Sequence, residues 1–141
     1  MIRLNIPREP YWLDLDFGVR VKVRPLTTAI MATTRAGTWR KVRDLAQRQI
    51  DDREVGANTS HMPDLSDPDV RLGVAEEMLT CELARWAIIE WDGVYAAEGD
   101  DVAKINEETV GDLMRAFPSV AERFLNRYTN HVDKLETEGN A

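Results

Sequence analysis

The chain is poor in the residues on which most catalytic and metal sites depend. Its 141 residues include one cysteine, Cys81, and two histidines, His61 and His131. A single cysteine excludes an internal disulfide and indicates a reducing compartment. Nothing near His61 completes a metal-binding set, and His131 and Asp133 are two positions apart, so they do not share a helix face. The sequence therefore predicts no metal site.

The sequence motifs of common enzyme classes are also missing. The chain has no glycine-rich phosphate loop, no paired-cysteine spacing and no nucleophile elbow. Its carboxylates are plentiful, but they fall on helix faces that we expect to be solvated and in one acidic loop. We therefore expect no catalytic residue, no cofactor and no enzymatic activity.

Long hydrophobic runs are absent as well. The apolar run that ends in Ile88-Ile89 is far shorter than the ~20 residues that a membrane span requires. The opening MIRLNIPREP contains a proline where the apolar core of a signal peptide would lie. These features predict a cytoplasmic protein without a membrane partner.

What the chain does contain is the composition of one ordinary globular domain, residues 1–141, with 43% hydrophobic and 30% charged residues. Its net charge of −7 is unevenly distributed. Residues 1–53 hold 11 Lys/Arg and 6 Asp/Glu, a net of +5, and residues 54–141 hold 7 and 19, a net of −12. This polarity favours contact with charged protein surfaces, including a homo-oligomer, unless the two halves neutralise each other within the fold. The acidic total disfavours nucleic acid.

Residues 11–25 predict a β-hairpin because apolar and charged residues alternate along them. A three-residue loop, Phe17-Gly18-Val19, would place Asp16 opposite Arg20 and Asp14 opposite Lys22, with the leucines opposite valines. Gly18 supplies the positive φ that this loop needs. A lone hairpin is marginal in water, so its Leu/Val face must pack on helices.

Four helices are expected after the hairpin, at about 27–50, 67–91, 106–117 and 119–135. Their start signals are Thr27 or Thr28, Ser66-Asp67-Pro68, Asn106 and a capping box at Ser119–Glu122. Gly37 marks a candidate bend in the first helix, and residues 51–66 read as a long polar loop that is mobile or orders on a partner. The predicted fold is mainly α, with the N-terminal hairpin packed on a bundle of about four helices.

The order of motifs resembles one known family. The hairpin is followed by R-P-L-T at 24–27, and a later segment reads I-x-E-W-D-G-V at 88–94. Gly99, the run I-N-E-E-T-V-x-x-L-M at 105–114, Pro118 and F-L-x-x-Y at 124–128 follow. This order is similar to that of the tail assembly chaperones of long-tailed bacteriophages and prophages.

The resemblance implies a protein that coats the tape measure protein, keeps it from aggregating and recruits tail tube subunits. It also implies a place in the host cytoplasm and absence from the mature virion. Because a tape measure is a long helix with an apolar stripe, the chaperone needs an adaptable apolar surface. We expect Trp39, Trp91, Val94 and Tyr95 to be the least buried candidates for that surface, with packing in or beside the core as the alternative for each.

Two other functions remain open at this stage. A structural head-tail connector or tail-completion protein would also act through protein-binding surfaces rather than through a catalytic site. A DNA-binding regulator would use the arginine-rich helix around residues 35–48, against the acidic balance of the whole chain.

Overall fold

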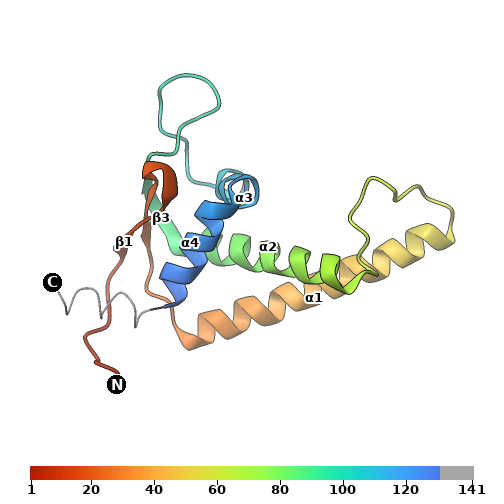
Figure 1. Cartoon of the computed structure of the whole chain (residues 1–141), viewed down its shortest axis with the longest axis horizontal. Coiled ribbons are helices and arrows are strands. Elements are labelled where there is room, and N and C mark those ends of the chain that lie inside the picture. Colours follow the sequence, from red (N-terminus) through yellow and green to blue (C-terminus); the bar gives the residue numbers. More distant parts are fainter. Residues whose placement is uncertain (131–141) are drawn as a thin grey trace.

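The computed structural model describes residues 1–130, and within them the protein is mainly α, as the sequence predicts. The elements are β1 (Tyr11–Asp14), β2 (Arg20–Val23), α1 (Thr28–Glu54), α2 (Pro68–Ala87), β3 (Ile88–Asp92), α3 (Glu107–Ala116) and α4 (Pro118–Thr129). In Figure 1 the strands, α3 and α4 gather at one end, from which α1 and α2 extend side by side. We call residues 11–31 and 80–129 the head, and residues 32–79 the arm.

The hairpin forms, but its register differs from the prediction by two residues. Asp14 pairs with Arg20 and Leu13 with Val21, because a 3₁₀ turn at Asp16–Gly18 (η1) lengthens the connection. Phe17 joins Gly18 at positive φ within that turn. A shift of two keeps every side chain on its expected face. The Asp14 carboxylate therefore accepts from Arg20 at 2.7 Å, and Asp16 is free to pair with Arg123 of α4 at 2.8 Å.

The second predicted helix does not reach Trp91. It ends at Ala87, and residues 88–92 form β3, which pairs antiparallel with β2 to give a sheet of order β1-β2-β3. Pairing with β3 satisfies the backbone of β2 on its second edge. It also sets Glu90 opposite Lys22, whose side chains lie 3.7 Å apart. A regular element does end at Asp92-Gly93, but that element is strand β3 and not a helix.

The buried face of the sheet belongs to the main core in the head. Leu13, Val21, Val23 and Trp91 lie in one apolar cluster with residues of α2, α3 and α4. The fully buried Tyr128 of α4 donates its hydroxyl to the carbonyl of Arg24 at 2.6 Å, and burial raises the pKa of that hydroxyl. This bond joins the last described helix to the end of the hairpin.

Most helix starts agree with the sequence. Thr27, Asp67 and Asn106 each accept a backbone N–H at the first turn, and Asn106 forms a reciprocal box with Thr109. The prediction of a capping box at Ser119–Glu122 is wrong. Helix α4 begins at Pro118, since proline suits the first helical position, and it has no side-chain cap. The expected stretch 131–135 of the last helix, with His131, lies outside the described residues.

The first helix is longer than predicted. It continues to Glu54 and passes through Gly37 without a break. The polar loop is correspondingly shorter, and buried Gln49 holds it to α1. The Gln49 amide donates to the carbonyl of Pro63 at 2.7 Å and accepts from the amide of Leu65 at 2.9 Å. No helix in residues 1–130 combines the length and the apolar character needed to cross a membrane.

Candidate partner-binding site

Cys81, in the head, is not placed to act as a nucleophile. The Cys81 thiol is buried and points at the carbonyl of Gly111, with Sγ 4.0 Å from the oxygen. Burial raises the pKa of this thiol, which keeps it protonated and makes it a poor nucleophile. Across residues 1–130, no three His, Cys, Asp or Glu side chains come close enough to share a metal ion.

The four residues expected to be exposed have different environments. Trp39 is 48% exposed and Tyr95 is 59% exposed, whereas Val94 is half-buried against the core. The expectation is wrong for Trp91, which is only 7% exposed. Its position on β3 turns the indole into the core, where Nε1 donates to the carbonyl of Ala103 at 2.8 Å. Trp39 and Tyr95 lie on separate parts of the molecule, in the arm and in the loop after β3.

The arm positions Trp39 through the way α1 packs. The helix buries Thr38, Val42 and Gln49, at spacings of four and seven, against the rest of the arm. Trp39 and Ile50 therefore point elsewhere: these two side chains are 48% and 44% exposed. A helix of 3.6 residues per turn places Trp39, Arg43, Ala46 and Ile50 together on one face beside the buried face. That second face has no covering element in residues 1–130.

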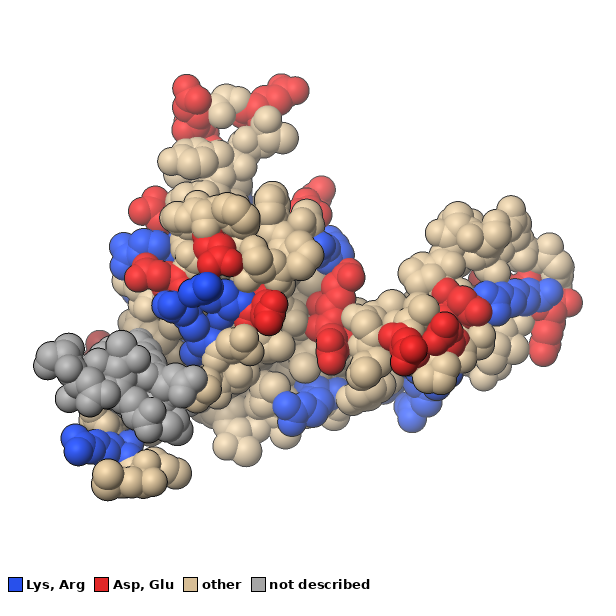
Figure 2. Space-filling view, in the orientation of Figure 1, with Lys and Arg blue, Asp and Glu red and all other residues tan. Residues whose placement is uncertain are grey.

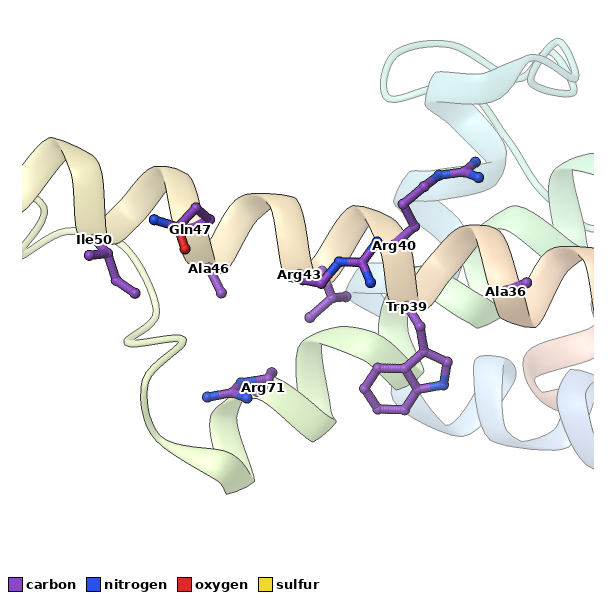
Figure 3. Close-up of a pocket in the computed structure, with 9 residues that line it drawn as sticks. Ala36, Trp39, Arg40, Arg43, Ala46, Gln47, Ile50 and Arg71 are labelled. Carbon is purple, nitrogen blue, oxygen red and sulfur yellow. The ribbon is translucent and has the colours of Figure 1, made fainter.

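This second face borders a groove of about 560 Å³. The α1 residues Ala36, Trp39, Arg40, Val42, Arg43, Ala46, Gln47 and Ile50 line it, together with Arg71 of α2. Figure 3 shows Trp39 and Arg71 on the lower side of α1 and the Arg40 side chain extending above it. We call this feature the arm groove; it is an apolar strip between cationic side chains.

The cations of the arm groove differ in their partners. Arg71 donates to the carbonyl of Leu65 at 2.9 Å, which helps to hold the loop beside the groove. Arg40 and Arg43 are exposed and make no hydrogen bond or ion pair within residues 1–130. The same is true of Arg35, which lines a smaller hollow on the other side of Trp39 with Leu72 and Leu79. Unpaired guanidinium groups beside apolar carbon make a surface suited to a partner with carboxylates and apolar side chains.

The loop after α1 fixes the outer end of the groove. Besides the Gln49 contacts, Arg53 donates to the Thr59 hydroxyl at 3.0 Å and pairs with Asp64 at 3.3 Å. Hydrogen bonds from Ser66 to the Asp64 carboxylate lower the pKa of that group. Most of this loop is polar, so hydrogen bonds rather than a large apolar core give it its shape.

Sequence reasoning found Trp39 but missed the groove around it. It treated Arg40 and Arg43 only as part of an arginine-rich helix around residues 35–48. The missed signal is that the polar residues Thr38 and Gln49 share a face with Val42. Comparisons with protein-family models, with curated proteins and with solved structures find no match to this chain.

Proposed function

We propose that this protein is a tail assembly chaperone of a long-tailed bacteriophage or prophage. In this role it binds the tape measure protein in the host cytoplasm, helps to recruit tail tube subunits and is absent from the mature virion. The observation that carries the proposal is the arm groove, where exposed Trp39 and Ile50 form an uncovered apolar strip beside unpaired arginines. The order of sequence motifs from Arg24-Pro25-Leu26-Thr27 to Tyr128 supports the same family.

The groove suits a helical partner on physical grounds. An amphipathic helix that lays its apolar side into a groove is anchored by a few residues spaced along one face. Trp39 and Ile50 are 11 positions apart on α1, a separation of ~16 Å at the rise of an α-helix. A partner helix of several turns can therefore contact both anchors at once. A holding function of this kind needs no catalytic group.

Co-expression with a fragment of the cognate tape measure tests the proposal. We expect the fragment to stay soluble with the wild-type chain and to precipitate with a Trp39→Ala/Ile50→Ala variant. Trp12→Ala is the matched control, because Trp12 is an exposed tryptophan on the outer face of the sheet. If a soluble cognate fragment fails to bind the wild-type chain in calorimetry, the proposed function is wrong.

Purified particles supply an independent check. Mass spectrometry of mature virions should detect no peptide of this chain, since a chaperone leaves before assembly is complete. Stoichiometric presence in the particle would instead identify a connector or tail-completion protein.

A further inference from the structure

Phe17, in the turn between β1 and β2, has an environment that neither its backbone nor its packing explains. Its φ of +61° lies in the left-handed region, which a bulky side chain rarely occupies. Its side chain is 77% exposed, so the ring adds little to the core. Residues held in such conformations cluster at ligand-binding and switch regions. A contact outside the fold would account for an aromatic residue at this position.

The turn η1 packs against the base of a projecting loop. A Cβ on Gly93 would lie 2.5 Å from the carbonyl oxygen of Gly18, so these two backbone segments are in contact. Beyond Gly93, Tyr95 pairs with Val102, and a backbone hydrogen bond lies on each side of that pair. Residues 94–103 therefore have a defined backbone shape, and we call them the ribbon. In Figure 1 the ribbon rises from the end of the head that carries the red turn of the hairpin.

The ribbon and the turn together present aromatic, aliphatic and acidic side chains. Tyr95 and Val102 are 59% and 48% exposed. No carboxylate of the ribbon forms a hydrogen bond or ion pair within residues 1–130. Figure 2 shows red acidic atoms at the tip of this projection, away from the body of the head. We call this surface the crest, and it consists of Phe17, Tyr95, Glu98, Asp100, Asp101 and Val102.

The charge of the crest restricts the kind of molecule that it can bind. Residues 92–104 hold four Asp/Glu and one lysine. Arg123, which lies beside the turn, is paired with Asp16 at 2.8 Å and does not neutralise the ribbon. The carboxylates do not converge on one point, since no three His, Cys, Asp or Glu side chains in residues 1–130 are close enough to share a metal ion. Spread carboxylates with apolar groups among them suit a basic protein surface rather than a small cation.

We propose that the crest docks on a partner protein that offers an apolar depression rimmed by lysine or arginine side chains. The ribbon projects from the head, so the partner supplies the concave side of the interface. Phe17 and Tyr95 enter the depression, because aromatic residues are enriched at the centres of protein interfaces. The carboxylates pair with cations at its rim. The proposed function assigns no partner to this surface, and the arm groove takes no part in the contact.

Photo-crosslinking from the full chain, in the cells that naturally produce it, tests the inference. A photoreactive phenylalanine analogue replaces Phe17 or Tyr95 in the crest. The control position is Trp12, an exposed aromatic residue on the outer face of the sheet. We expect both crest probes to capture the same protein, at a surface with an excess of lysine and arginine, and the control probe not to capture it. Mass spectrometry identifies the protein and the cross-linked peptide.

Charge reversal separates the crest from the general acidity of the chain. In calorimetry with the purified captured protein, Asp100→Lys/Asp101→Lys should weaken binding by about tenfold or more, because like charges then face each other. Asp44→Lys/Glu54→Lys changes the net charge equally at exposed positions of the arm, and it should bind like the wild type.

Phe17→Asn distinguishes a binding role from a structural one. Asparagine tolerates the left-handed backbone better than phenylalanine does, so the melting temperature of the chain should not fall. Binding to the captured protein should nevertheless weaken by about fivefold or more, because one aromatic anchor is lost. A purely structural role would give the opposite pair of results, a lower melting temperature with unchanged binding.

The inference is wrong if neither crest probe captures a protein above the level of the control. It is also wrong if the captured surface has no excess of lysine and arginine, or belongs to a second copy of this chain. Unchanged binding by Phe17→Asn or by the charge-reversed crest would overturn it as well. A probe at Trp39 reports separately on the arm groove, so the proposed function and this inference can each fail while the other stands.

Discussion

The head and the arm are built in different ways. The head buries its largest side chains completely, with Phe124 and Tyr128 stacked at 5.2 Å between ring centroids. The arm has a thin interior that includes polar Thr38 and Gln49, and it leaves Trp39 half-exposed. Apolar burial scales with area, so most of the folding free energy must come from the head. The arm is held mainly by hydrogen bonds, which leaves its apolar groups available to a partner.

Truncating one aromatic in each region gives the largest expected contrast. Phe124→Ala removes a fully buried ring and should lower the free energy of unfolding by ~3–5 kcal/mol. Trp39→Ala should change it by less than ~1 kcal/mol, because the indole is already half-exposed. Urea denaturation followed by circular dichroism measures both. Phe124→Leu retains most of the buried volume and should lie between them; equal losses for Phe124→Ala and Trp39→Ala would remove the distinction between head and arm.

Gly93 and Gly99, both in the head, distinguish the stability cost of a steric clash from the cost of an unfavourable backbone conformation. A Cβ at Gly93 would lie 2.5 Å from the carbonyl oxygen of Gly18, whereas a Cβ at Gly99 would meet nothing within 4 Å. Both have positive φ, +82° and +86°. Gly99→Ala should cost only the conformational term of about 1–2 kcal/mol. Gly93→Ala should cost about 2–4 kcal/mol, since the hairpin backbone must also move. Thermal denaturation of the two variants tests this prediction. Similar melting temperatures would show that the backbone of η1 moves at little cost in free energy.

A smaller loss than at Phe124 or Gly93 is expected at Gln49, in the arm. Gln49→Ala leaves the carbonyl of Pro63 and the amide of Leu65 without their partner, a loss of ~1–3 kcal/mol that should open the loop locally. Hydrogen exchange at Leu65 and proteolysis within residues 55–67 should both accelerate, while the head keeps its protection. Gln47→Ala is the matched control, because within residues 1–130 that exposed side chain forms a hydrogen bond only with the Asp51 carboxylate. Accelerated exchange in α4 would mean that arm and head unfold together.

The sequence predicts the parts of this fold that depend on local patterns. The alternation at residues 11–23 places each hairpin side chain on its correct face, and Thr27, Asp67 and Asn106 mark true helix starts. Features that depend on distant partners were missed. An apolar run such as Ile88-Ile89 fits a buried helix and a buried strand equally well, and only β2 decides between them. The same limit hides the arm groove, because which face of α1 is covered depends on α2.

The hydrogen bond from Tyr128 to the carbonyl of Arg24 spans 104 positions of the chain. A ribosome releases the hairpin first, and a two-stranded hairpin has little stability alone. The core of the head also needs Val110, Val120 and Phe124, which emerge much later. During synthesis, then, α1 and α2 are exposed before a stable head exists. All nascent chains on one messenger RNA pass through this stage. The arm of a nascent chain can therefore meet a binding partner before its own head has folded.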